Sequence, residues 1–429
     1  MRMTFWIGAL VTVGALYAQD ISGDWQATLK AGPREFRLIM KIEKGPNGGW
    51  NGSLFSIDQV PDRGVGITAN SVILEGSTLK FTINAARASY EGKVSADGAS
   101  ISGTWTQGEP LPLEFQRATP ESAWKDPSPH RVQFVTVDKD VRLEVLDWGG
   151  SGRPLVLLAG LGNTAHIFDK FAPKLTANHH VYGITRRGFG VSSAPAAGYS
   201  ADRLGDDVLA VLDAVKLERP VLAGHSIAGE ELSSVASRHP ERVAGLIYLD
   251  AGYSYAYYDR SRGDLDIDLL ELQKKLEQLL PGNGAQNDPK ALVHELLEAT
   301  LPGFERDLRD RQKKLQVTPA ALLAAQASSP LSDAARAIQT GEQKYTNIPV
   351  PVLAIYAVPH DLGPAGDDAA ARAAFEANDE ATTGAQAKAF ESGVPSARIV
   401  RLPHANHYVF FSNEADVLRE MNAFLGGLP

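Results

Sequence analysis

The sequence predicts two folded parts: a small antiparallel β region, followed by a larger and mostly parallel sheet with helices on both faces. Three observations predict this division. Residues 20–117 alternate between apolar and polar positions in short stretches, residues beyond 131 alternate between apolar strands and helical patterns, and a charged helical insertion occupies about 252–344. The chain has 429 residues, of which 44% are hydrophobic and 22% charged, a composition typical of soluble globular domains.

The first segment has the composition of a secretory signal. The stretch "MRMTFWIGALVTVGALYAQD" combines a positive Arg2, an apolar core from Phe5 to Leu16 and a small Ala18 before polar residues. The apolar core is shorter than the roughly 20 residues that a spanning helix needs. We therefore expect residues 1–18 to be a cleaved signal peptide, and the mature protein to be periplasmic or extracellular without a membrane span.

Charge and cysteine content exclude several classes of function. The formal net charge is −9, whereas nucleic-acid binding needs clustered Lys and Arg, so no nucleic-acid partner is expected. The chain has no cysteine, which excludes disulfides, thiolate metal sites and a cysteine nucleophile. Stability must therefore come from the packing of a large core.

Residues 20–117 are predicted to form a small antiparallel β domain, as a sheet or a barrel. Alternate residues from Phe36 to Ile42 are apolar, as are alternate residues from Leu79 to Ile83. Glycine-rich turn signals separate these stretches. The alternation predicts strands with one buried and one exposed face.

The second part, residues 131–429, follows a segment at 118–130 that carries three prolines among polar residues and is predicted to be a linker. Six apolar strands are expected, at residues 153–160, 179–185, 219–224, 243–250, 350–357 and 396–403. Runs this apolar are typical of a parallel sheet that helices cover on both faces. The insertion at 252–344 is predicted to form a helical cap at the carboxyl edge of this sheet, where ligands bind in such folds.

One serine occupies a position that needs an explanation. The stretch "VLAGHSIAGEEL" places Ser226 among small residues, directly after an apolar strand and before a helical pattern, and it matches G-x-S-x-G except for Ala228 in place of the last glycine. In such a turn the serine backbone is strained, and its hydroxyl lies at the positive end of the helix dipole. A serine that only caps the helix is the alternative, and it predicts no catalytic partners elsewhere.

Over about Gln133 to the C-terminus the chain resembles the α/β-hydrolase family. The stretch "ITRRGFGVSS" is similar to the family's Arg-Gly-x-Gly-x-Ser turn, and "LGDDVLAVLDAVKLERPVLAGHS" resembles the helix and strand before its nucleophile. The resemblance implies that Ser226 is the nucleophile and that His407, in "LPHANHYVFFS", is the general base. His404 is expected to be a loop or supporting residue.

The resemblance also implies an oxyanion hole made of two backbone amides, those of Leu161 and Ile227. The stretch "LLAGLGNTAHIF" occupies the place of the family's oxyanion segment, with Ala159 where histidine is common. Because the amides act without their side chains, Ala159 does not remove them.

Two aspartates compete for the role of the acid that orients His407. Asp361 follows the strand after the cap, which is the family's usual place for the acid, and it is the residue we favour. Asp250 ends the preceding strand, a position that some family members use instead. Asp250 also has a structural explanation, since an aspartate at a strand end often bonds local backbone amides.

Several conspicuous side chains have structural explanations. Glu230 and Glu231 open the helix after the serine, where carboxylates suit the helix dipole, although Glu230 is near enough to touch substrate. Arg186 and Arg187 are expected to brace a turn. Four tyrosines at the start of the cap either line a substrate pocket or pack the cap onto the sheet: Tyr253, Tyr255, Tyr257 and Tyr258.

These residues predict an exported serine hydrolase that cleaves carboxylic esters of small molecules through an acyl-serine intermediate. No cofactor is needed, and a metal bound by His404 and His407 is disfavoured because no carboxylate or third histidine stands near them in the sequence. Amidase, peptidase or carbon–carbon bond hydrolase activity on the same fold stays open, as does a catalytically inactive binding protein.

Overall fold

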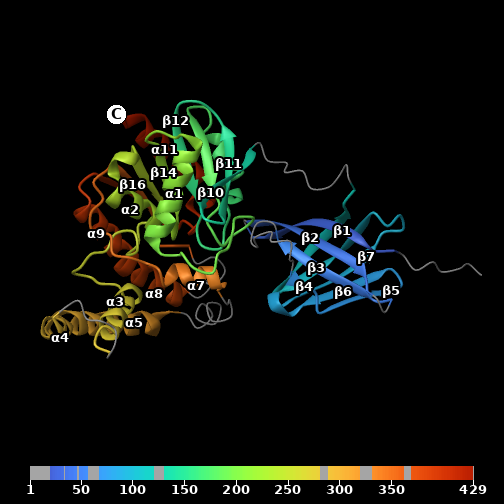
Figure 1. Cartoon of the computed structure of the whole chain (residues 1–429), viewed down its shortest axis with the longest axis horizontal. Coiled ribbons are helices and arrows are strands. Elements are labelled where there is room, and N and C mark those ends of the chain that lie inside the picture. The colour runs from blue at the N-terminus through green and yellow to red at the C-terminus, as the bar shows by residue number, and fades with distance from the viewer. Residues whose placement is uncertain are drawn as a thin grey trace, which may run out of the picture. The chain divides into compact units, whose positions relative to one another are not determined.

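A computed structural model describes residues 20–32, 34–45, 48–56, 67–119, 130–280, 288–318, 331–361 and 369–428 (Figure 1). The described residues form two compact units, one ending at residue 119 and the other starting at residue 130. The predicted signal peptide, residues 1–18, and residues 120–129 of the predicted linker lie outside the described residues.

The first unit is an antiparallel sheet of nine strands. They are β1 (Gly23–Ala31), β2 (Arg34–Lys44), β3 (Trp50–Ser56), β4 (Ile67–Thr68), β5 (Ser71–Glu75), β6 (Thr78–Ile83), β7 (Ala88–Val94), β8 (Ser100–Gln107) and β9 (Glu109–Arg117). Their order in the sheet is β4-β3-β2-β1-β9-β8-β7-β6-β5. This confirms the predicted small antiparallel β domain.

The sheet of the first unit curls around its own core. Its two edge strands, β4 and β5, follow each other in the chain, so the two edges must adjoin. Alternate residues point inward and form one apolar cluster, in which Trp25, Phe81 and Phe115 are fully buried. The Tyr90 hydroxyl, also buried there, donates to the carbonyl oxygens of Ile101 at 2.9 Å and Leu113 at 3.1 Å. The period-two pattern in the sequence is therefore the pattern of this core.

The second unit contains a sheet of eight strands. They are β10 (Arg131–Asp138), β11 (Val141–Gly149), β12 (Arg153–Leu158), β13 (His179–Ile184), β14 (Val221–His225), β15 (Gly245–Leu249), β16 (Val352–Ala357) and β17 (Ala397–Leu402). Their order is β10-β11-β13-β12-β14-β15-β16-β17, and all pairs from β13 to β17 are parallel. The six predicted strands are all present, and the predicted α/β-hydrolase fold is confirmed.

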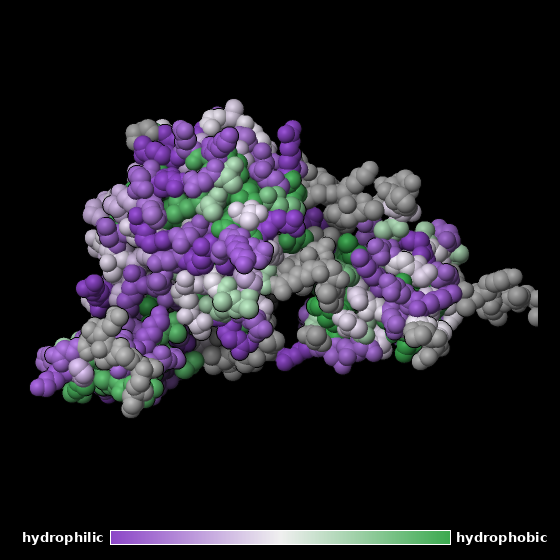
Figure 2. Space-filling view, in the orientation of Figure 1, coloured by the Kyte–Doolittle hydropathy of each residue, from purple (hydrophilic) through white to green (hydrophobic). Residues whose placement is uncertain are grey.

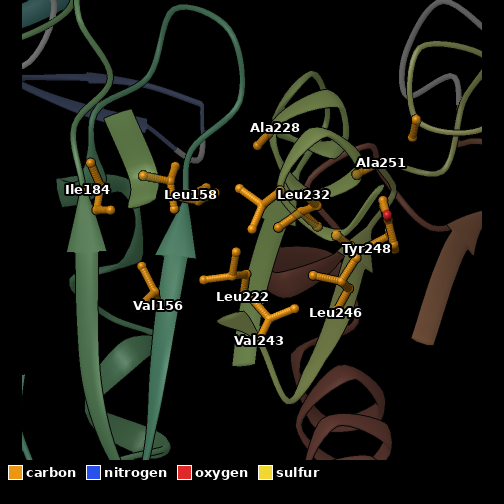
Figure 3. Packing of buried hydrophobic residues seen from close by; sticks show 14 of the residues in the cluster. Val156, Leu158, Ile184, Leu222, Ala228, Leu232, Val243, Leu246, Tyr248 and Ala251 are labelled. Carbon is orange, nitrogen blue, oxygen red and sulfur yellow. The ribbon is translucent and has the colours of Figure 1, made fainter. Parts of the chain in front are cut away.

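Helices cover both faces of this sheet. They are α1 (Ala201–Val215), α2 (Ala228–Arg238), α9 (Ala385–Gly393), α10 (Val409–Ser412) and α11 (Glu414–Gly427), and a further helix, α8 (Ala369–Asp379), precedes α9 in the chain. On β12, Val156 and Leu158 pack into the cluster that includes α1, α2 and α9, whereas Leu155 and Leu157 pack into the cluster that includes α10 and α11. Figure 3 shows the first of these clusters around the strands that carry the site. Two buried faces explain why the strands are continuously apolar.

The predicted insertion is helical. Between β15 and β16 it contains α3 (Leu265–Glu277), α4 (Pro289–Glu295), a π-helical turn (Leu296–Thr300), α5 (Leu301–Val317) and α7 (Asp333–Gln339). Leu272, Leu292 and Leu296 bury against one another within it. Other apolar side chains stay exposed, such as Leu297 of the π-helical turn and Leu308 of α5, and Figure 2 shows apolar surface over the end of this segment that carries α4 and α5. None of the helices in the described ranges combines the length and apolar composition needed to cross a bilayer.

Candidate active site

Ser226 lies in a sharp turn between β14 and α2. Its backbone has a φ of 55°, in the left-handed region that side chains other than glycine rarely adopt. Tight packing holds this conformation: a Cβ on Gly229 would lie 2.1 Å from the carbonyl oxygen of Ala251, and one on Gly224 would lie 3.0 Å from the Cβ of Ala228. Ala228, which replaces the last glycine of the G-x-S-x-G pattern, therefore fits because the residue that faces it, Gly224, has no side chain.

His407 comes from the loop between β17 and α10 and lies beside this turn. The Nε2 of His225, the residue before the serine, is 3.0 Å from the carbonyl oxygen of His407, and the two rings are 4.7 Å apart. The Nδ1 of His407 lies 2.6 Å from Oδ2 of Asp250, which directly follows β15. Three separate segments thus bring a serine, a histidine and a carboxylate to one end of the sheet, and these are the residue types of a catalytic triad.

The sequence favoured Asp361 as the carboxylate that contacts His407, and this prediction is wrong, because the contact is made by Asp250. Asp361 is exposed, and its backbone N–H donates to the carbonyl oxygen of Ala405 at 2.9 Å. Asp250, the alternative, is fully buried against His407. Because β15 and β16 are parallel neighbours, the residues after both strands reach the same edge of the sheet, and only the fold decides which carboxylate meets the histidine.

Asp250 accepts hydrogen bonds from four groups. Its Oδ1 accepts from the backbone N–H of Ala357 at 3.0 Å, and its Oδ2 is 2.9 Å from Nε2 of His360 and 3.0 Å from the hydroxyl of Tyr253, besides His407. Burial acts to raise the pKa of Asp250, but the hydrogen bonds and charges of the two histidines outweigh it and hold the pKa well below its usual value. These contacts therefore favour the ionised carboxylate.

His360 is a site residue that the sequence reasoning missed. Its Nε2 faces Asp250 and its Nδ1 lies 2.8 Å from Oδ2 of Asp379, at the end of α8. Burial acts to lower the pKa of His360, but the two carboxylates outweigh it and raise this pKa to about 10. The signal available in the sequence was its position, since His360 directly precedes Asp361 in the segment after a buried strand.

The two predicted oxyanion amides lie close to Ser226. A Cβ on Gly160 would lie 3.1 Å from the Cβ of Ser226, so the backbone leading into Leu161 passes directly beside the serine. Within the described part of the chain, the N–H groups of Leu161 and Ile227 take part in no hydrogen bond. Both are thus available to an oxyanion bound at Ser226.

An ion pair connects the oxyanion loop to the helix that follows the serine. Arg186 pairs with Glu231 of α2, and its Nη2 donates to the carbonyl oxygen of Ala159 at 2.9 Å. Both charged side chains are buried. The neighbouring Arg187 forms a separate bidentate pair with Asp207 of α1, at 2.5 and 2.6 Å. The two arginines do brace a turn, as the sequence indicated, and Arg186 in addition fixes the loop that carries Leu161.

The tyrosines at the start of the cap divide into two pairs. Tyr253 donates to Asp250, and the side chain of Tyr255 interacts with Ser226. Tyr257 instead packs on Phe390 with ring centres 5.5 Å apart, and Tyr258 donates to Asp268 of α3 at 2.7 Å. The first two tyrosines therefore border the site, and the second two pack the cap.

The cap also approaches the serine directly. Ala335 and Ile338 of α7 belong to the same apolar cluster as Ile227, and Leu161 and Tyr255 pack against that cluster. A helix of the insertion therefore packs on Ile227, the residue that follows Ser226, as expected for a cap.

Glu230 is fully buried next to this region, and neither of its carboxylate oxygens has a hydrogen-bond partner among the described residues. Burial, together with the nearby carboxylates of Glu342 and Glu231, raises its pKa well above the usual value. The pKa of Glu230 is higher in the folded state than in the unfolded state. At a pH between these two values the unfolded protein has lost the Glu230 proton, whereas the folded protein keeps it. Glu230 therefore lowers the free energy of unfolding as the pH rises above about 4.5.

We therefore expect Glu230→Gln to stabilise the protein by on the order of 1 kcal/mol at pH 7 and to have little effect at pH 4. Thermal melting at both pH values measures this, with Glu218→Gln at an exposed position as the matched control. An equal gain at both pH values would show that ionisation of Glu230 is not the cause.

Two groups of described residues bring three potential metal ligands together: Asp250, His360 and His407 at the site, and His130, His166 and Asp169 elsewhere in the second unit. The reason given from the sequence against a metal at His407, that no carboxylate or third histidine is near, is thus wrong in space, because Asp250 and His360 reach His407 from other segments. At the site, however, Nδ1 of His407 and Oδ2 of Asp250 are 2.6 Å apart, whereas two ligands of one tetrahedral ion are about 3.3 Å apart. The site distances fit hydrogen bonds rather than coordination.

The fold, the serine turn and the adjacent histidine and carboxylate are those typical of the α/β-hydrolase class. Residues 155–420 match the family described as "Alpha/beta hydrolase family", and the chain belongs to that family.

Its curated relatives include a 2-hydroxymuconate semialdehyde hydrolase of Pseudomonas sp. (strain CF600), 35% identical over 111 residues, which are 25% of this chain and 39% of that protein. A putative non-heme haloperoxidase of Mycobacterium phage D29 is 32% identical over 112 residues, 26% of this chain and 40% of the relative. The chain thus spans about two fifths of the length of these relatives. Among solved structures, an E-2-(acetamidomethylene)succinate hydrolase is similar with 20% identity and a TM-score of 0.41, over 70% of this chain and 100% of that one.

Proposed function

We propose that the protein is an exported serine hydrolase that cleaves carboxylic esters of small molecules through an acyl-serine intermediate. The observation that carries this proposal is the strained Ser226 turn with His407 bonded to the buried Asp250 beside it. Export rests on the composition of residues 1–18.

In the proposed reaction Ser226 attacks the ester carbonyl while His407 takes the serine proton at Nε2. Asp250 holds the Nδ1–H of His407 and stabilises the imidazolium that forms. The amides of Leu161 and Ile227 donate to the tetrahedral oxyanion. His407 then protonates the leaving alcohol. In the second half of the reaction His407 takes a proton from water, which attacks the acyl-serine, and returns that proton to Ser226 as the acid is released.

A carbon–carbon bond hydrolase is the second candidate, because one relative is a 2-hydroxymuconate semialdehyde hydrolase. The same serine and histidine can serve either reaction, and fold does not choose between them. Two kinds of substrate distinguish ester hydrolysis from carbon–carbon bond hydrolysis. The first is a panel of p-nitrophenyl esters of increasing acyl length, and the second is a vinylogous 1,5-diketone. Turnover of the diketone alone would favour the second candidate.

Labelling with a fluorophosphonate tests the nucleophile. Native protein should take up one label, located at Ser226 by mass spectrometry, because only an activated serine reacts. Ser226→Ala should take up none, whereas Ser261→Ala, at an exposed serine of the cap, should label normally. Absence of label on the native protein would favour the inactive binding protein.

A further inference from the structure

Asp250 lies between two histidines. Its Oδ2 contacts Nδ1 of His407 at 2.6 Å and Nε2 of His360 at 2.9 Å, and the two rings are 6.2 Å apart. A triad needs only one histidine on its acid. The second one therefore calls for a role of its own.

The surroundings of His360 fix its protonation state. Asp379 accepts from both the backbone N–H and the Nδ1 of His360, each at 2.8 Å, and its other oxygen accepts from the Thr383 hydroxyl at 2.7 Å. With a carboxylate oxygen at each ring nitrogen, both nitrogens must donate, which only the imidazolium can do. His360 therefore carries a positive charge next to the proposed acid.

Other ionisable groups around the pair come from three segments. After β15, Tyr253 contacts both Asp250 and His360, with its hydroxyl 3.2 Å from Nε2 of His360, and Tyr255 lies near the same carboxylate. The ring of His225, at the end of β14, is 4.7 Å from the ring of His407, and the ring of Tyr408 is 5.8 Å from it. Within this group, His360 is the positively charged side chain that contacts Asp250.

We propose that His360 is a positioning residue whose fixed positive charge, held by Asp379, orients Asp250 and partly offsets its charge, so that the site stays active at lower pH. The proposal rests on the proposed function. Asp250 alone would favour the protonated form of His407, which cannot accept the serine proton. A cation on the far side of Asp250 opposes this effect, whereas Asp379 reinforces it from a greater distance.

The two outer residues should therefore shift the pH profile in opposite directions. In His360→Gln the cation is lost, and the acid limb of the kcat/KM profile should move up by about one pH unit, the size expected for a unit charge about 6 Å away in a partly solvated site. In Asp379→Asn the distant anion is lost while His360 stays charged by Asp250, and the limb should move down by a smaller amount.

The profile is measured with p-nitrophenyl acetate, with the concentration of active enzyme set by fluorophosphonate titration. His404→Gln is the matched control, because this histidine lies three residues from His407, has a side chain that is 64% exposed and should leave the limb in place. A merely structural role for His360 predicts lower melting temperatures without opposite shifts. If His360→Gln does not fold, the downward shift in Asp379→Asn still tests the charge.

Unshifted limbs, or shifts in the same direction, would overturn the role of His360 and leave the proposed hydrolase intact. A native protein that neither labels nor turns over esters would overturn the proposed function itself. The two failures are therefore distinguishable.

Discussion

Asp250→Asn should lower kcat on a chromogenic ester by about four orders of magnitude, the loss that follows when a triad aspartate becomes an amide. Both oxygens of Asp250 accept hydrogen bonds, so an amide NH₂ must face a donor on whichever side it lies. The histidine then loses both its orientation and the charge that stabilises its imidazolium. The measurement is kcat per active site, with the melting temperature followed in parallel.

Asp361→Asn is the matched comparison, because Asp361 was favoured from chain order and is exposed in the structure. This variant should keep kcat within a few fold of the native value. The reverse result, with Asp361→Asn inactive and Asp250→Asn active, would mean that the acid is Asp361 in solution and that the contact with Asp250 is not the catalytic one.

Arg186→Met should reduce stability by about 3–5 kcal/mol, because it leaves the carboxylate of Glu231 buried without its partner. Activity should fall as well, since the bond from Arg186 to the carbonyl oxygen of Ala159 holds the loop before Leu161. Urea unfolding measures the first effect and kcat the second.

The double variant Arg186→Met/Glu231→Met separates these two roles. Replacing both charges removes the unpaired carboxylate and should restore most of the stability. The loop contact stays absent, so kcat should remain low. Recovery of both properties together would show that Arg186 affects activity only through folding.

The fold was predictable because its signals are local. Continuous apolar runs such as residues 350–357 identify buried parallel strands, and the alternation from Phe36 to Ile42 identifies a sheet with one buried face. The two strands β10 and β11, which begin the second sheet, were not predicted. In β10 only Val135 is buried, and Val132 and Phe134 are exposed, so its pattern is too weak to distinguish from a loop.

The site was predictable only in part. Small residues around Ser226 and the stretch around His407 carry the family's pattern, so both could be named from the sequence, and their catalytic roles stay predictions. The partner of His407 could not be named, because Asp250 and Asp361 follow neighbouring strands and chain order does not measure distance. His360 was missed for the same reason: its two carboxylate partners are remote in sequence, one before the cap and one after it.

The insertion between β15 and β16 has a consequence for how this site can change. The backbone N–H of Tyr258 donates to the carbonyl oxygen of Tyr345 at 2.8 Å, so the two ends of the segment between them lie side by side. A segment attached in this way can be lengthened, shortened or exchanged for another without altering strand register. The first residues of the insertion are different, because Tyr253 and Tyr255 contact Asp250 and Ser226. A cap transplanted from another family member would therefore need its junction beyond Tyr258, so that the new cap brings its own substrate preferences while the proposed catalytic residues keep their contacts.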